Sequence, residues 1–142
     1  MRLQLASTIL LLTTAAAAQG TTMSFSSFGT ACGATLTGTV LRTTTAAVAR
    51  LDVTNALAGA PAILVAGGPA LAPSPLPNST CTLLVNPRVT TFVVLDAVGS
   101  AAFRFQIPPI VPISVDFQAL IYTPTRAGRM VESSNGTRFT AQ

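Results

Sequence analysis

Apolar and polar residues alternate with a period of two along several segments of this chain. Successive side chains of a β-strand point to opposite faces of a sheet, so this alternation predicts strands with one buried and one polar face. It is clearest in AVARLDVT (47–54), AAFRFQIP (101–108) and VDFQALIY (115–122). No segment has the apolar stripe of an amphipathic helix. The pattern therefore predicts an all-β protein built from antiparallel strands.

Turn-forming residues separate the predicted strands. DAVGS (96–100) is interpreted as a hairpin connection. GGPALAPSPLPNST (67–80) contains four prolines, which exclude it from a sheet interior, so we expect a stiff connector that crosses between sheets. A binding loop is the alternative interpretation of that segment. We expect about eight strands, at 34–41, 46–54, 61–67, 81–86, 89–95, 100–107, 114–122 and 137–141. Their spacing favours an antiparallel β-sandwich, Ig-like or jelly-roll-like.

The N-terminal residues have the pattern of a secretory signal peptide. Arg2 precedes an apolar stretch (3–12), and Ala16-Ala17-Ala18 offers a cleavage site. We expect residues 1–18 to be removed and 19–142 to form a single β-sandwich domain. A membrane anchor is the weaker alternative because the apolar stretch is short for a bilayer. A secreted, extracellular or cell-surface location follows from this interpretation.

Cys32 and Cys81 are the only cysteines of the chain. Two thiols in a small exported domain usually pair, because the compartment is oxidising. The alternatives are a metal site, which needs more ligands and usually histidine, and a redox pair, which usually has the C-x-x-C spacing. Lipid attachment at Cys32 is a further alternative, although this cysteine lies far beyond the apolar stretch. We therefore predict a disulfide, which would stabilise the fold by roughly 4 kcal/mol.

Most of the side chains that enzymes use for proton transfer are missing. The chain has no histidine and no lysine, so no base is available for a serine or cysteine nucleophile. Its four acids are Asp52, Asp96, Asp116 and Glu132. We interpret them as solvated or turn-forming residues rather than a glycosidase pair or a calcium site. The expectation is a protein that is not an enzyme, with no catalytic residue, no metal and no cofactor.

The charged residues give little indication of a binding partner. Seven arginines follow residue 18 and are scattered, whereas nucleic-acid binding uses a clustered basic face, so no nucleic-acid partner is expected. Cell-wall polymers, other surface proteins or further copies of the chain are the candidate partners. Asn78 and Asn135 match the N-x-[ST] glycosylation pattern, and both are expected in surface loops. Sugar-binding faces usually carry aromatic platforms, and this chain has no tryptophan and one tyrosine.

The motifs of the chain follow one another in a familiar order: TACG (30–33), GAPAILVAG (59–67), LPNSTCTLLVNP (76–87), DAVGSAAFRFQIP (96–108), FQALIY (117–122) and SSNGTRFT (133–140). This order resembles a recurrent secreted bacterial β-sandwich module, often found at the C-terminal end of larger exported proteins. The resemblance implies a β-sandwich fold and export from the cell. The family has no assigned activity, so it implies no catalytic residues. Here the module follows the signal peptide directly, so no role as an accessory to an attached enzyme or adhesin is implied.

These observations predict a non-enzymatic, secreted or cell-surface β-sandwich with a structural or adhesive role and an unknown ligand. A lectin-like carbohydrate-binding module is the alternative.

Overall fold

The computed structural model describes residues 21–43, 46–108, 112–126 and 128–142, and the predicted signal peptide (1–18) lies outside these residues. Nine strands and their turns make up the described residues, in which no helix occurs. None of them therefore forms a helix long and apolar enough to cross a membrane. The strands are β1 (Met23–Phe28), β2 (Thr35–Arg42), β3 (Ala47–Thr54), β4 (Pro61–Pro75), β5 (Thr82–Val94), β6 (Ala101–Gln106), β7 (Ile113–Thr125), β8 (Gly128–Ser133) and β9 (Gly136–Ala141).

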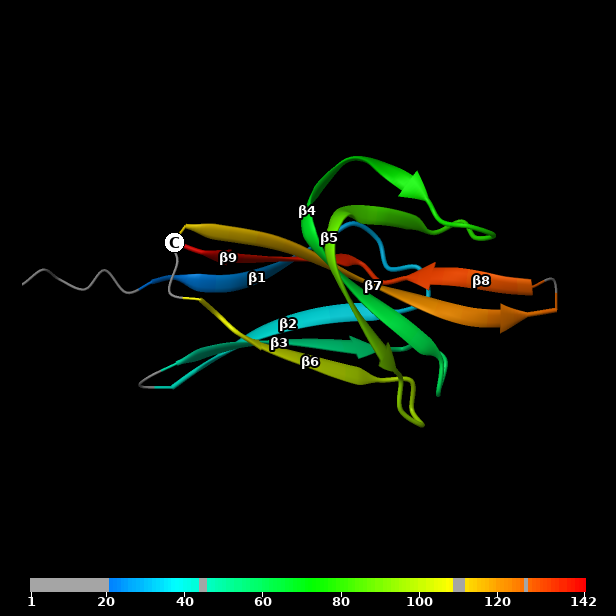
Figure 1. Ribbon diagram of the computed structural model, residues 1–142, viewed down its shortest axis with the longest axis horizontal. Coiled ribbons are helices and arrows are strands. Elements are labelled where there is room, and N and C mark those ends of the chain that lie inside the picture. The colour runs from blue at the N-terminus through cyan, green and yellow to red at the C-terminus, as the bar shows by residue number, and fades with distance from the viewer. Residues whose placement is uncertain (1–20, 44–45, 109–111, 127) are drawn as a thin grey trace, which may run out of the picture.

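The strands form two antiparallel sheets that pack as two layers (Figure 1). Sheet A has the strand order β1-β9-β7-β4-β5, and β8 pairs with the C-terminal half of β7. Sheet B has the order β2-β3-β6. The prediction of an all-β antiparallel sandwich is confirmed.

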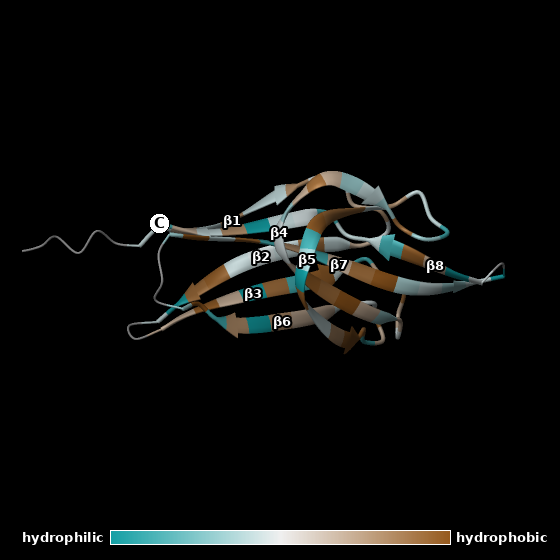
Figure 2. Cartoon of the chain, turned by 45° about the horizontal axis from the view of Figure 1, so that its top comes forward, coloured by the Kyte–Doolittle hydropathy of each residue, from teal (hydrophilic) through white to brown (hydrophobic). Residues whose placement is uncertain are grey.

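The core lies between the sheets and follows the predicted alternation. Leu51 and Val53 of β3 are fully buried, as are Ala119 and Ile121 of β7. Hydrophobic and hydrophilic residues alternate as brown and teal bands along β3 and β6 (Figure 2). Burying one large aliphatic side chain stabilises a fold by about 1.5–3 kcal/mol. The period-two pattern therefore identified the face of each strand that supplies this energy.

The number and extent of the strands differ from the prediction. The segments 81–86 and 89–95 belong to one strand, β5, which bends at an irregularity near Arg88. The strands β1 and β8 were not predicted, because each pairs on one side only and carries few buried apolar residues. Nine strands therefore replace the eight expected.

The proline-rich segment (67–80) does not cross between sheets. Strand β4 continues through it to Pro75, and beyond Gly67 it pairs with β5 alone. Prolines are tolerated there because that part of β4 has no partner on its second side. The prolines are thus kept out of the sheet interior, as expected, but the predicted crossing between sheets is wrong.

The crossings lie elsewhere. DAVGS (96–100) joins β5 of sheet A to β6 of sheet B, so the hairpin interpretation is wrong. Residues 55–60 make another crossing, from β3 to β4, and the chain also changes sheets between β1 and β2 and between β6 and β7. In the first crossing Leu95 is buried in the core directly before the turn, which draws the chain across the sandwich.

Candidate functional site

The chain makes an irregular step between β8 and β9, which both pair with β7. Leu120 lies opposite Ser133, and Phe117 lies opposite Thr137. Residues 134–136 therefore lie opposite residues 118–119, which leaves one residue extra on the β8–β9 side. This is a β-bulge, a feature that often redirects a side chain.

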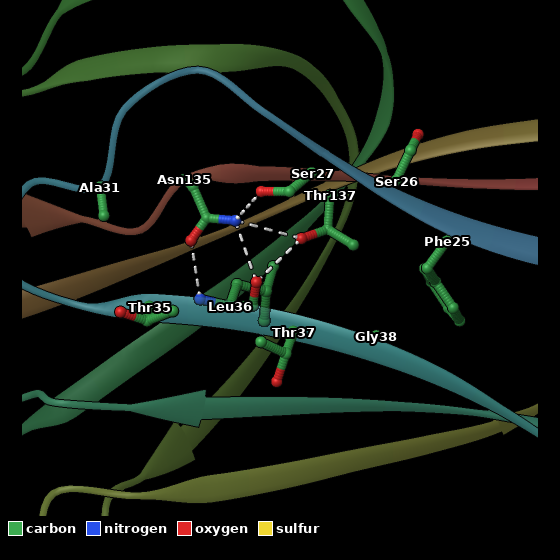
Figure 3. A pocket seen from close by; sticks show the side chains of 10 residues that line it. All are labelled: Phe25, Ser26, Ser27, Ala31, Thr35, Leu36, Thr37, Gly38, Asn135 and Thr137. Carbon is green, nitrogen blue, oxygen red and sulfur yellow. Dashed lines mark hydrogen bonds between the residues drawn. The ribbon is translucent and has the colours of Figure 1, made fainter.

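The redirected side chain is Asn135, which is only 6% exposed. Its Oδ1 accepts a hydrogen bond from the Leu36 backbone N–H at 2.9 Å, and its Nδ2 donates to the Leu36 carbonyl at 2.9 Å. Leu36 belongs to β2, the edge strand of sheet B. The amide thus pairs with one backbone residue of the opposite sheet in the way a neighbouring strand would (Figure 3). Thr137 and Ser27 complete the network, with the Thr137 hydroxyl donating to the same carbonyl at 3.1 Å.

The two glycosylation patterns have different surroundings. Asn78 is exposed in the turn after β4, which confirms the surface position expected for it. The surface position expected for Asn135 is wrong, because its amide is buried and hydrogen-bonded in the contact between the sheets. A glycan needs that Nδ2 atom, so the folded protein offers only Asn78 as an acceptor.

Gln118 is a second buried amide with a structural role. It is fully buried on the outer face of β7, where its Oε1 accepts from the Leu84 N–H at 2.8 Å. Its Nε2 donates to the carbonyls of Thr82 at 2.9 Å and Ser134 at 3.0 Å. These bonds hold the start of β5 against β7.

The predicted disulfide joins Cys32 to Cys81, with the two Cα atoms 5.6 Å apart. Cys32 also exchanges two backbone hydrogen bonds with Ser133, at 2.8 and 3.0 Å. The disulfide therefore joins the segment before β5 to the connection between β1 and β2, and the backbone bonds of Cys32 hold that connection against the end of β8. Its sulfur atoms are consumed in a structural bond and are not available for metal binding or nucleophilic attack.

Asp116 is not the solvated acid that its place in the pattern predicted. It is 1% exposed, and both of its oxygens accept hydrogen bonds from Arg138, at 2.6 and 2.9 Å. The hydrogen bond and charge of Asp116 raise the pKa of Arg138 above its usual value. The Arg138 guanidinium also lies 5.3 Å from the centre of the Phe28 ring. On the outer face of sheet A, Asp116 of β7 and Arg138 of β9 therefore form a cross-strand ion pair.

Two other acids, Asp52 and Asp96, are also engaged in local contacts. Asp52 lies 2.8 Å from Arg50 at the surface of sheet B, and its hydrogen bond raises the pKa of Arg50. Asp96 Oδ1 accepts from the N–H groups of Val98 and Ser100, which confirms its predicted turn role. Across the described ranges, no three histidine, cysteine or acidic residues gather into a metal-sized cluster.

A groove lies between the edges of the two sheets, where β1 approaches β2. Its volume is about 290 Å³, and its lining includes Ser26, Ser27, Thr35 and Thr37. The Ser27 hydroxyl points towards Asn135, whereas the hydroxyls of Ser26 and Thr37 point away from it (Figure 3). The Phe25 ring forms one wall and rests over Gly38, where a side chain would collide with it. Asn135 forms part of the lining, but its amide is already hydrogen-bonded to the protein.

The outer face of sheet A has an apolar region at β5. Phe92 is 66% exposed and Val94 is 58% exposed, although both lie in a regular strand. Pairing places Ile63 next to Phe92 and Pro61 next to Val94. Tyr122 lies beside Pro61 at a small hollow of about 200 Å³. We call these five residues the β5 surface.

Sequence reasoning did not identify this surface. The segment VTTFVV (89–94) lies in a predicted strand, but an uninterrupted run of uncharged residues does not reveal which of its faces is buried. The signal that could have found it is the run itself. Six uncharged residues rich in β-branched side chains are unusual for an exposed edge strand.

Comparison with known proteins finds no matching family, no matching curated protein and no matching solved structure. The function of the chain is therefore argued from its own surfaces.

Proposed function

We propose that this protein is an exported, non-enzymatic module with a structural or adhesive role, and that the β5 surface makes its contacts. The observation that carries the proposal is the exposure of Phe92 and Val94 on an edge strand. Contiguous apolar patches with a polar surround commonly mark interaction sites on folded proteins. Natural edge strands are usually protected by charges, bulges or prolines, and positions 89–94 have none of these.

The polar groups of the chain support a non-enzymatic role. Asp116 and Asp52 form ion pairs with arginines, and Asp96 closes a turn. Gln118 and Asn135 use their amides to hold strands together. Catalysis needs titratable groups that can reach a substrate, and these contacts tie up the best candidates.

Export is supported by the signal-peptide pattern at residues 1–18 and by the Cys32–Cys81 disulfide. Disulfides form and persist mainly in oxidising compartments. Fractionation of the producing cells tests this part of the proposal. The protein should be found in the medium or on the cell surface with residues 1–18 removed, and a reduced, uncleaved cytosolic protein would contradict it.

The adhesive role is tested by replacing an exposed apolar residue of the β5 surface. Phe92→Ser should lower retention of the purified protein on cell envelopes and on an alkyl-coated matrix. Leu71→Ser is the matched control, because Leu71 is fully exposed and lies outside the β5 surface. Equal losses for the two variants would mean that general hydrophobicity, and not the β5 surface, causes retention.

A lectin-like function is the second candidate, and the groove between β1 and β2 favours it. Hydroxyl groups next to an aromatic ring are chemically suited to a sugar. A glycan array with the purified protein tests this function. Binding that is lost in Thr37→Val, a change at an exposed residue of the groove lining, would place carbohydrate recognition ahead of the adhesive role.

A further inference from the structure

The outer edge of β5 has free backbone groups. Within the described residues β5 pairs with β4 alone, and the Leu95 N–H donates to the Ala60 carbonyl at 2.9 Å. Backbone groups of an antiparallel strand point alternately to its two sides. The even-numbered residues Thr90, Phe92 and Val94 therefore direct their N–H and C=O groups away from β4. This edge is a template for another strand.

A charged residue lies at each end of the free β5 edge. Arg88 is the extra residue of the β4–β5 irregularity, because Val89 and Pro87 have partners on β4 and Arg88 has none. Asp96 follows the strand, and its Oδ1 is used by the turn, whereas its Oδ2 accepts no hydrogen bond from the described residues. Both side chains belong to exposed residues. One end of the edge is thus positive and the other negative.

A second copy of the same edge is complementary to this arrangement. We propose that two copies of the protein pair through β5 in antiparallel orientation, with the two-fold axis at Phe92. Pairing about residue 92 sets residue 88 of each copy opposite residue 96 of the other, because 88 + 96 = 2 × 92. Arg88 of each copy then faces Asp96 of the other. This inference rests on the proposed function and names the partner of the β5 surface.

The same register satisfies the backbone. Thr90 of each copy lies opposite Val94 of the other, and Phe92 lies opposite its own equivalent. All of these residues have outward-facing backbone groups, so each pair can exchange two hydrogen bonds. Phe92 side chains from the two copies become cross-strand neighbours, which favours pairing of aromatic residues. The two-fold contact uses the β5 edge of both copies and therefore closes as a dimer.

Cysteine cross-linking tests the register. In a hydrogen-bonded antiparallel pair the Cα atoms are about 5.5 Å apart, within the roughly 4.4–6.8 Å range of disulfides. Phe92→Cys should therefore form a covalent dimer under mild oxidation, seen on a non-reducing gel. Thr90→Cys alone should not, because its equivalent in the dimer is four residues out of register. A mixture of Thr90→Cys and Val94→Cys, which keeps Phe92 in both proteins, should cross-link.

Each outcome of this experiment is decisive. Cross-linking of Phe92→Cys and of the mixture, with none for Thr90→Cys alone, supports the proposal. Self-cross-linking of Thr90→Cys would establish another register and overturn this one. Absence of cross-links in both Phe92→Cys and the mixture would overturn pairing through β5. Circular dichroism of each variant checks that the exposed substitutions leave the fold intact.

Charge reversal tests the ion pairs independently by sedimentation velocity across a concentration series. In the dimer, Arg88→Asp sets an aspartate of each copy opposite Asp96 of the other, so two repulsive pairs replace the two ion pairs. Dimerisation should therefore weaken about tenfold or more. Asp96→Asn keeps the side-chain oxygen that closes the turn, and adding it to Arg88→Asp should recover part of the loss. A monomer at every concentration, or a dimer indifferent to Arg88→Asp, would overturn the inference. Adhesion that is lost in Phe92→Ser while the protein is monomeric would leave the proposed function standing.

Discussion

Replacing Asn135 by alanine tests whether one amide holds the edges of the two sheets together. The change removes both hydrogen bonds to the backbone of Leu36 and the bond to Ser27. Alanine has no polar atom, and the bulge that directs position 135 inward stays in place. The variant therefore isolates the contribution of the side chain to the contact between β9 and β2.

The size of the effect follows from which groups lose their partners. The Leu36 N–H is buried and has no other acceptor, and an unsatisfied buried donor costs about 1–3 kcal/mol. The Leu36 carbonyl keeps the Thr137 hydroxyl, and Ser27 is exposed enough to bond water. We therefore expect Asn135→Ala to lower the free energy of unfolding by about 2–3 kcal/mol. That is a large part of a typical total of about 5–15 kcal/mol.

Urea denaturation followed by far-ultraviolet circular dichroism measures this loss. Thr137→Val is the matched control, because it removes one donor from the Leu36 carbonyl while Asn135 still donates. It should cost about 1 kcal/mol or less. A loss below about 0.5 kcal/mol in Asn135→Ala, or equal losses in both variants, would refute the argument that the Leu36 N–H depends on the amide.

Asn135→Asp adds a pH dependence that a purely steric effect would lack. An aspartate there would lie beside the carbonyl oxygens of Leu36 and Gly136, so its folded-state pKa should rise above the ordinary value of about 3.9. The folded state then binds more protons than the unfolded state between the two pKa values. The stability of this variant, relative to the parent, should therefore fall as the pH rises from about 4 towards neutrality.

Three further changes test other parts of the fold by the same measurement. Cys81→Ala should lower stability by about 2–5 kcal/mol, and reducing agent should destabilise the parent but not the variant. Gln118→Met keeps the volume but leaves the partly buried Leu84 N–H without its acceptor, and it should cost about 1–3 kcal/mol; a neutral result would contradict the role given to this amide. Gly99→Ala should cost more than about 1 kcal/mol, because φ is +73° there and the new methyl group would meet the Ala56 carbonyl; wild-type stability would show that the turn relaxes freely.

The sequence was sufficient to predict the fold class and the inner faces of the strands. Alternation in 47–54 and 101–108 placed Leu51 and Phe103 on the core side, as the structure has them. The pairing of Cys32 with Cys81 followed from their being the only two cysteines. The strand faces could be predicted because they depend only on the two-residue alternation of the local sequence. The disulfide could be predicted because two cysteines allow only one pairing.

Predictions that depend on the path of the chain between strands were less successful. DAVGS (96–100) has the composition of a tight turn, and Asp96 closes one. Composition, however, does not say whether the next strand pairs with the previous one or joins the facing sheet. Burial of Leu95 decides this through contacts with residues distant in sequence, which no local pattern contains.

The polar positions were the least predictable. Asp116 and Gln118 lie on the polar phase of β7, as expected, yet both are buried. The strand is flanked on both sides in the sheet, and the start of β5 binds Gln118 from the outer side. The alternation along a strand predicts the face to which a residue points. Whether that face is exposed to solvent depends on the tertiary structure.

The buried polar groups explain where a function of this protein must be sought. Asn135, Gln118 and Asp116 would have been the natural candidates for ligand binding, and each has its polar atoms bonded to the protein. A ligand that competed for them would have to break contacts that join the two sheets or hold β5 in place. The unpaired edge of β5 carries no such cost, because its outward backbone groups and Phe92 are exposed in the isolated chain. Association through that edge adds hydrogen bonds and removes apolar surface from water without disturbing the core.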